Sequence, residues 1–281
     1  MLKKTFIIIA ALIVAGFLYI DVSGDNFKEK VRREVRQITD GAVSLPPQKF
    51  TFNQLRGLPE PVQRYFKHVL NDGQEYIRTV NLKQTGEFRT KESDRWVPIE
   101  AKQYNAIAIP SLVWHARLKP TPYTWIEAQD FYHKGSGFME GKLLSVFPLM
   151  FDSGKEMELS SLSRFLSEAP WYPTALLPGK NLEWKAIDFH SAKALITDSG
   201  YSVSAVFTFG DNGEITKVTT EDRYRNVSGK KEKLPWTAYY KNYQERNGMK
   251  IPTEVEVKWN LQKRNFQYAK LKIVEIQYDK F

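Results

Sequence analysis

The pattern of hydrophobic and polar positions changes twice along the chain. Behind Lys3 and Lys4, an uncharged apolar run extends from Phe6 to Ile20. Such a run is typical of a membrane anchor or of a secretory signal. We therefore assign residues 1–24 to an N-terminal membrane anchor or signal segment, which places the body of the chain outside the cytoplasm. A secreted or periplasmic protein, released by signal cleavage, is the alternative.

Helical spacing continues after the apolar run. Between Asp25 and Asp40 the apolar residues recur every three or four positions, and Lys and Arg occupy the other faces. This pattern predicts an amphipathic helix that lies on the bilayer or on the body of the protein. Pro46 and Pro47 stiffen the segment that follows. Residues 25–50 are therefore expected to form a basic stalk and linker.

The body begins with a short predicted helix over 58–70, after which the period of the pattern changes to two. The alternation of apolar and polar residues is clearest over 201–209 and 255–261, and it predicts strands. Short Gly-containing turns separate the segments, so neighbours are antiparallel, because parallel strands need long crossovers. The predicted strands are 76–90, 95–108, 111–119, 124–134, 137–148, 181–189, 192–198, 201–210, 214–227, 235–246, 250–262 and 267–279.

Many meandering strands around one internal helix do not fit a doubly wound α/β protein. They predict a mainly β (α+β) domain over residues 51–281. We expect a single curved antiparallel sheet that forms a barrel or half-barrel with about two packed helices, preceded by the N-terminal membrane helix. The internal helix is predicted over 155–168, with Ser153 and Glu156 as its capping box.

The stretch APWYPTALLPG, residues 169–179, follows this helix and gathers apolar side chains among prolines. Pro170 ends the helix, because the residue before a proline avoids the α region. If the segment were exposed, its Trp, Tyr and Leu side chains would form a large apolar patch. We therefore expect it to bury itself in the concave face of the sheet, where it would contact an apolar ligand.

Aromatic residues supply most of the candidate ligand site. Large aromatics can wall a ligand cavity or form a packed core, and the sequence leaves both readings open. Arg223 could hold a carboxylate or phosphate head group, with a cross-strand salt bridge as the alternative. The candidate ligand-binding residues are Trp114, Trp171, Tyr172, Leu176, Leu177, Trp184, Arg223, Tyr224 and Trp236.

Composition limits the chemistry that the chain can perform. It has no Cys, which excludes disulfides, thiolate catalysis and Cys-based zinc sites. No two of its four His have metal-ligand spacing, and no serine-nucleophile or phosphate-loop motif occurs. We therefore expect no metal and no cofactor. The net charge is +9, but the Lys and Arg residues are spread along most of the chain and form no basic stripe with aromatic residues between them. We therefore expect membrane lipids as partners and no nucleic acid.

A carboxylate–histidine pair is the candidate for catalysis. His115 and Arg117 share one face of their predicted strand, and Glu127 and His133 could share a face of the next. An acid–base pair drawn from His115, Glu127 and His133 would suit a hydrolase. The alternative is that they are outward polar residues of a half-solvated strand.

Several separated motifs resemble one known family. They are LPEPVQRYFKHVL, VWHARLK, FMEGKLLSVFPL, RFLSEAPWYPTALLPG, LEWKAID and NGMKIPTEVEVKW. Together they are similar to an uncharacterised bacterial family of membrane-associated domains of unknown function. The resemblance covers about Gly57 to Tyr278 and implies an N-terminal membrane segment in many members, with no established activity. It implies a signature at Trp171, Pro173, Thr174, Trp184 and Asp188.

By a looser fold analogy, the order of strands and helices is similar to lipoprotein-carrier half-barrels, in which a sheet wraps round helices. The leading hypothesis is a membrane-tethered extracytoplasmic protein that binds an apolar or lipid-like ligand, or a lipidated partner, without catalysis. One alternative is a hydrolase that uses the pair from residues 111–140. Another is a structural envelope protein with a solid core. The oligomeric state stays open.

Overall fold

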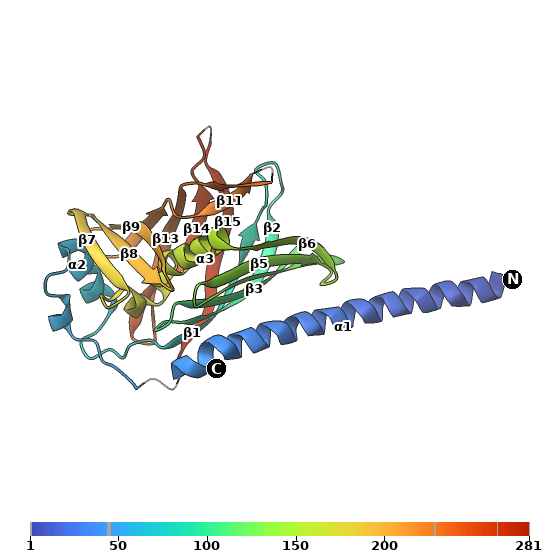
Figure 1. The fold of residues 1–281 in the computed structure, drawn as a ribbon, viewed down its shortest axis with the longest axis horizontal. Helices are drawn as coiled ribbons and strands as arrows, with labels where there is room; N and C mark the ends of the chain where they lie inside the picture. The colour runs from blue at the N-terminus through green and yellow to red at the C-terminus, as the bar shows by residue number, and fades with distance from the viewer. Residues whose placement is uncertain (1, 44–45, 228, 263, 281) are drawn as a thin grey trace.

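A single antiparallel sheet of 13 strands runs through the protein (Figure 1). The computed structural model describes residues 2–43, 46–227, 229–262 and 264–280. The strand order is β6-β5-β4-β3-β2-β1-β15-β14-β13-β10-β9-β8-β7, and β11 and β12 form a separate hairpin. This confirms the mainly β class and the single curved sheet. Because β6 and β7 stand at two separate edges, the sheet is an open half-barrel.

Most strands follow one another as antiparallel hairpins, as the alternating pattern predicts. Their bounds are β1 Thr79–Phe88, β2 Val97–Ala106, β3 Ser111–Thr121, β4 Thr124–His133, β5 Ser136–Leu143, β6 Phe147–Ser153, β7 Leu182–Asp188, β8 Ser191–Asp198, β9 Tyr201–Phe209, β10 Ile215–Thr220, β11 Tyr224–Val227, β12 Lys230–Lys233, β13 Trp236–Arg246, β14 Met249–Trp259 and β15 Phe266–Tyr278.

Turn residues explain where the strand predictions succeed and where they are wrong. The predicted turns at Gly135, Gly200 and Gly248 have φ between 74° and 84°, which glycine adopts at little cost. The predicted strand 137–148 is instead interrupted by a turn at Leu144 and Ser145, whose φ values are 52° and 61°. Non-glycine residues rarely take this conformation, so the sequence did not signal the turn or the strand β6 that follows it.

Other strands were merged or missed for related reasons. The predicted strand 214–227 comprises β10 and β11, which belong to different sheets. The short strand β12 was not predicted. Its sequence, Lys-Lys-Glu-Lys, carries no apolar alternation, and it pairs only with β11.

Two helices of the body lie close to where the apolar spacing predicts them, α2 Glu60–Val69 and α3 Lys155–Ser167. Three short 3₁₀ turns were not predicted: η1 Phe52–Leu55, η2 Ala169–Trp171 and η3 Pro173–Leu176. The predicted capping box of α3 is wrong. Ser153 belongs to β6, and the residue before the helix is Gly154, which makes no side-chain cap and has a φ of 91°. Strand β6 therefore extends to Ser153, and only Gly154 separates it from the start of α3.

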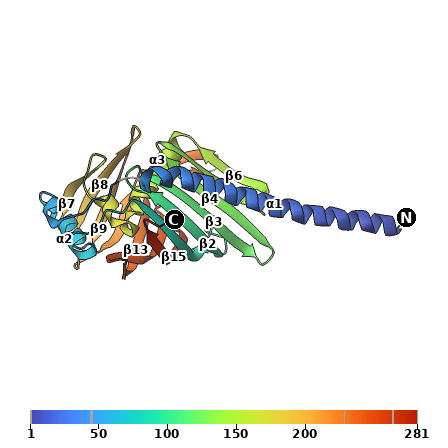
Figure 2. The ribbon, with the colours of Figure 1, turned by 90° about the horizontal axis from the view of Figure 1, so that it is seen from below.

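Helix α1, Leu2–Val43, is one continuous helix of 42 residues. Its N-terminal half projects from the body (Figure 1), and its C-terminal half lies along the outer face of the sheet (Figure 2). There it forms a small hydrophobic cluster with β2, β3 and β4: Phe27, Val31, Ile38, Ala42, Ala106, Val113 and Phe131. The amphipathic helix was predicted to lie either on the bilayer or on the body of the protein, and in the structure it lies on the body.

The main hydrophobic core lies on the opposite, concave face of the sheet. Helix α3 and the segment 169–177 fill this face, and α2 closes its far end. Successive side chains of a strand point to opposite faces. On β3, for example, Val113 faces α1 while Leu112 and Trp114 face the main core. Strands β2 to β5 are therefore covered on both faces.

The pairing of β1 with β15 depends on a close approach at Gly86. A side-chain carbon at this position would lie 1.9 Å from the backbone oxygen of Lys270. We expect Gly86→Ala to force these strands apart and to lower the free energy of unfolding by about 2 kcal/mol, as overpacking does elsewhere. Denaturant titration of the full chain in detergent measures this.

Gly41→Ala is the matched control for this prediction. A carbon added at Gly41 meets nothing within 4 Å, and alanine stabilises an exposed helix relative to glycine by up to about 1 kcal/mol. Equal stability of the Gly86→Ala variant and the wild type would show that β1 and β15 are not paired in this register.

Candidate functional site

The proline-rich segment lies buried against the concave face of the sheet. Pro170 and Pro173 stand in the first turns of η2 and η3, where proline has its φ angle pre-set and no N–H is needed. Trp171, Tyr172, Leu176 and Leu177 are at most 5 % exposed. This confirms the prediction that the segment buries itself.

Side chains from the sheet hold this segment through its backbone carbonyls. The Trp184 indole donates a hydrogen bond to the carbonyl oxygen of Leu176 over 2.9 Å. The Tyr278 hydroxyl donates to the carbonyl oxygen of Trp171 over 2.7 Å. An irregular segment leaves carbonyls without partners in the chain around it, and buried carbonyls need such donors. The position of the segment is therefore fixed by long aromatic side chains.

Two further signature residues, Thr174 and Asp188, accept hydrogen bonds from backbone N–H groups. The hydroxyl of Thr174 accepts the backbone N–H of Ile77 over 3.0 Å. Asp188 accepts the N–H of His190 over 2.9 Å in the turn between β7 and β8. The second contact is the one that an Asp side chain usually makes in a turn.

The other predicted ligand-binding residues divide between the core and its rim. Trp114 and Trp236 are buried in the main core, and Trp184 is packed against it. Arg223 lies at the rim with its guanidinium 4.7 Å from the Trp236 ring. Tyr224, on β11, donates its backbone N–H to the hydroxyl of Ser160 on α3. The structure thus gathers the apolar candidates together and places the two polar ones at their edge.

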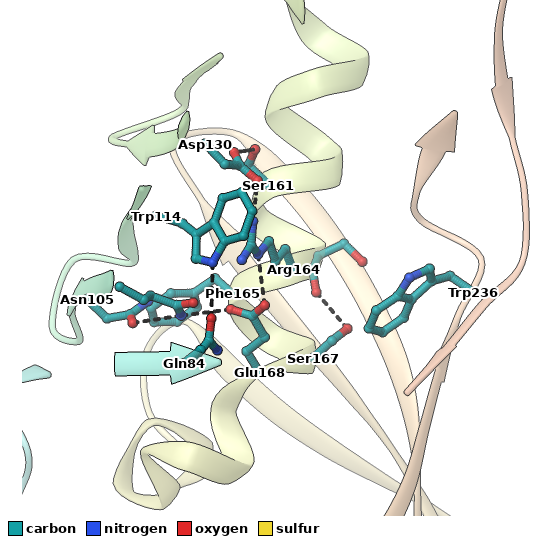
Figure 3. Close-up of polar contacts among 12 residues, drawn as sticks. Gln84, Asn105, Trp114, Asp130, Ser161, Arg164, Phe165, Ser167, Glu168 and Trp236 are labelled. Atoms are coloured by element: carbon teal, nitrogen blue, oxygen red, sulfur yellow. Dashed lines mark hydrogen bonds and ion pairs between the residues drawn. The ribbon is translucent and has the colours of Figure 1, made fainter. Parts of the chain in front are cut away.

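Helix α3 meets the sheet through a buried ion network (Figure 3). The Arg164 guanidinium lies 2.8 Å from Asp130 on β4 and 2.8 Å from Glu168 at the end of the helix. Only 10 % of the Arg164 side chain and 3 % of the Asp130 side chain are exposed. Burial alone would lower the pKa of Arg164, but the two carboxylates outweigh it and raise that pKa above its usual value.

The network continues into the sheet. The carboxylate of Glu168 accepts a hydrogen bond from Gln103 over 2.8 Å, and the same amide nitrogen lies 3.1 Å from the side-chain oxygen of Asn105. The Arg164 guanidinium also lies over the Trp114 ring, 4.8 Å from its centre. A charged group thus sits beside an aromatic wall on the concave face.

Four serines of α3 extend the polar contact. All four, at positions 160, 161, 163 and 167, are buried. Ser161 donates to Asp130 over 3.2 Å, and Ser163 lies 3.3 Å from Thr220 on β10. Sequence reasoning used only the apolar stripe of this helix and missed its polar face. The spacing of Arg164 and Glu168 could have predicted this polar face, since residues four apart on a helix lie next to each other and can pair.

Several buried polar atoms in this region have no protein partner. They are Nε2 of Gln84, Oε1 of Gln103 and Nε1 of Trp171. A buried donor or acceptor without a partner is costly unless a water or ligand satisfies it. These atoms could therefore accept or donate hydrogen bonds to a polar group that enters the concave side.

The predicted catalytic pair lies on the outer face of the sheet, under α1. His115 Nε2 lies 2.5 Å from the Glu127 carboxylate, which also pairs with Arg117. The Phe27 ring of α1 lies 5.5 Å from the His115 ring. His133 lies apart from this pair, hydrogen-bonded to Ser111 over 2.8 Å. The structure therefore brings two of the three candidates together, and α1 covers them.

Burial and pairing act in opposite directions on these groups. Burial alone would raise the pKa of Glu127, but hydrogen bonds and charge from His115 and Arg117 hold that pKa below its usual value. Burial lowers the pKa of His133. Within the described ranges, no three His, Asp or Glu side chains gather as metal ligands do.

Two hollows open on the surface of the body. One, of about 250 Å³, is lined partly by His68, Glu214 and Tyr243. The other, of about 300 Å³, is lined partly by Glu256 and Gln267. Neither is lined by residues of the 169–177 segment.

Removing the buried cation tests the ion network. Arg164→Met should lower the free energy of unfolding by about 3–5 kcal/mol at pH 7, because two buried carboxylates lose their partner. Denaturant titration of the full chain measures the difference. The triple variant Arg164→Met, Asp130→Asn, Glu168→Gln should recover most of the stability, because it also removes the two charges left without a partner. A triple variant no more stable than Arg164→Met would contradict the network.

The lowered pKa of Glu127 gives a second prediction. Its ionised form stabilises the fold above the ordinary carboxyl value of 4.5, and this contribution is lost as the pH falls through the lower pKa of the folded state. Glu127→Gln should therefore lower the free energy of unfolding at pH 7. It should also make that free energy fall less steeply below about pH 4.5 than it does in the wild type, as measured by denaturation from pH 7 to 3. Glu100→Gln, at an exposed ion pair, is the control. An equally steep fall in Glu127→Gln would refute the pairing.

Solved structures similar to this chain share little sequence with it. A domain described as a candidate outer membrane lipoprotein-sorting protein from Vibrio parahaemolyticus is 11 % identical, with 71 % of this chain and 85 % of that one covered at a TM-score of 0.39. A LolA superfamily protein from Nitrosomonas europaea is 10 % identical, with 77 % and 91 % covered at 0.34. A DUF1329 family protein from Desulfovibrio piger is 9 % identical, with 88 % and 93 % covered at 0.39.

No curated protein matches the sequence. One helix among the described residues, within Lys3–Ala42, is long and apolar enough to cross a membrane, and its most apolar stretch is not buried. The family resemblance is confirmed, because a family model matches residues 56–278. This range includes the ion network, the buried segment, and the Trp184 and Tyr278 side chains that donate hydrogen bonds to it. The chain belongs to the family of unknown function DUF6920.

Proposed function

We propose that this protein is a membrane-tethered extracytoplasmic domain that holds an apolar or lipid-like ligand between its concave sheet and a removable cover. The cover consists of α3 and the segment 169–177. The observation that carries the proposal is a polar seam beside the main hydrophobic core, in which Arg164 and Glu168 at the end of α3 meet Asp130 of β4 and Gln103 of β2.

The tether is supported by the two halves of α1. The first half exposes large apolar residues all round: Phe6, Ile7, Ile8, Ile9, Leu12, Ile13, Val14, Phe17, Leu18, Tyr19 and Val22. A helix that is apolar on all sides is stable in a bilayer and costly in water. The second half is packed on the sheet. The two lysines that precede the apolar run favour a cytoplasmic N-terminus, which puts the body on the other side.

The ligand site is supported by the chemistry of the concave face. Trp114, Trp184 and Trp236 provide an aromatic wall there, and apolar ligands bind to such walls. The unpaired polar atoms of Gln84, Gln103 and Trp171 could receive a head group. The segment 169–177 occupies this space in the structure, so a ligand would enter as the segment moves away.

The polar seam would lower the cost of that movement, and an entering apolar ligand would replace the contacts that Phe165 and Trp171 make with the main core. Separating two apolar surfaces exposes both to water at about 25 cal/mol per Å². A buried ion pair costs much less to separate, because the hydration that the charges regain offsets most of their mutual attraction. Arg164, Asp130 and Glu168 would therefore be rehydrated as the cover opens.

A structural envelope protein with a solid core is the second candidate. It is favoured by the burial of Trp171 and Tyr172, neither of which lines either of the two surface hollows described above. On this reading the seam never opens, and the signature residues serve stability alone.

A disulfide across the seam distinguishes the two. A side-chain carbon at Gly137 on β5 would lie 3.5 Å from the hydroxyl oxygen of Ser161 on α3, within reach of a disulfide. The chain is otherwise free of cysteine. We expect the double variant Gly137→Cys, Ser161→Cys to bind a fluorescent fatty acyl probe when reduced and to lose at least about tenfold in affinity when oxidised.

The single variants Gly137→Cys and Ser161→Cys are the controls, and each should bind the probe under both conditions. Equal binding by the oxidised and reduced double variant would show that no ligand enters beneath α3. If none of the proteins binds the probe, and solvent extraction of the purified wild type releases no lipid, the solid-core reading holds.

A further inference from the structure

The end of the sheet from which α1 emerges carries exposed apolar residues that the ligand site does not use. They lie on the edge strand β6 and at the turn between β3 and β4. Each is about half exposed or more: Tyr123 87 %, Phe147 55 %, Leu149 54 %, Met150 46 % and Phe151 67 %. Elsewhere on the body such residues stand singly or, at Ile187 and Phe189, as one pair, whereas four of these five fall within one strand of seven residues.

Their position relative to α1 is fixed by the turn between β5 and β6. A side-chain carbon on Gly24 of α1 would lie 3.6 Å from the hydroxyl oxygen of Ser145. The Trp125 indole of β4 donates to the same hydroxyl over 3.0 Å. The tips of the β3–β4 and β5–β6 hairpins therefore lie beside α1 where it leaves the sheet (Figure 2).

The exposed apolar half of α1 begins immediately beyond this point, at Val22. If that half enters a bilayer, the membrane surface meets the body at these two tips. An exposed apolar patch of this kind marks an interaction site, and aromatic residues are favoured at the membrane–water boundary. The continuity with α1 selects the bilayer as the partner of the patch.

We propose that the two hairpin tips form a second membrane contact, in which Tyr123 and Phe147 enter the head-group region of the bilayer that α1 spans. This inference rests on the membrane tether of the proposed function. It does not depend on a ligand under α3.

The free edge of β6 limits the depth of this contact. Among the described strands β6 pairs with β5 alone, so most of its other edge presents backbone N–H and C=O groups, which cannot enter the hydrocarbon core without partners. Only the tip therefore inserts. Phe151 lies four residues along the strand from Phe147, about 13 Å at the usual rise, and should remain at the outer boundary of the head groups.

Single cysteines in the cysteine-free full chain test the proposal. Tyr123→Cys, Phe147→Cys and Phe151→Cys would each carry an environment-sensitive fluorophore, with the protein reconstituted in vesicles of phosphatidylethanolamine and phosphatidylglycerol. Ile187→Cys is the control, at an equally exposed apolar position on the opposite edge strand. Ala11→Cys reports whether α1 is inserted. Spin-labelled lipids quench a fluorophore that lies within the bilayer.

We expect lipid quenching of the label at positions 123 and 147 to be at least about twofold stronger than at position 187, because interfacial contacts reach about 5–10 Å into the boundary. Quenching at position 151 should be intermediate. Quenching at 11 with none at 123 and 147 would overturn the second contact and leave the tether intact. Absence of quenching at 11 would overturn both. A blue shift at 147 without lipid quenching would also overturn the proposal, because it would place a second copy of the chain on β6.

Discussion

Arg164 joins α3 to the concave face of the sheet, because its guanidinium lies between a carboxylate of the sheet and a carboxylate at the end of the helix. Asp130 anchors it to β4, and Glu168 positions it just before the buried segment 169–177. Such a network needs all of its members, since a buried charge without its partner is strongly destabilising. It therefore fixes where α3 sits on the sheet while adding little net adhesion, and the apolar side chains of α3 and the segment 169–177 supply most of the adhesion.

The same strands also carry the attachment of α1. On β3, Val113 and His115 face that helix, while Trp114 faces Arg164 and the concave core. Strands β2 to β5 thus separate the outer face that α1 covers from the concave face that α3 covers. Helix α1 is continuous from its apolar half to its packed half. With the proposed tether, this continuity would hold the body in one orientation to the bilayer and the proposed ligand site at a set height above it.

The sequence predicted much of the fold because apolar alternation, helical spacing and Gly turns act locally. It predicted the burial of Trp171 and Tyr172 for the same reason, since so many apolar side chains must leave water. It did not predict the turn at Leu144 and Ser145, where tertiary contacts impose a rare backbone conformation. Nor did it predict the seam at Arg164, because Asp130 lies 34 residues away in the chain and charged residues are usually exposed.

Hydrogen exchange of the full chain in lipid nanodiscs tests the central claim most directly, because it measures how easily each segment separates from the rest. The account predicts that the amides of residues 155–177 exchange together, and at least about tenfold faster than those of β13 and β14, through an opening smaller than global unfolding. If residues 155–177 exchange as slowly as the central strands, the cover does not open and the account is contradicted.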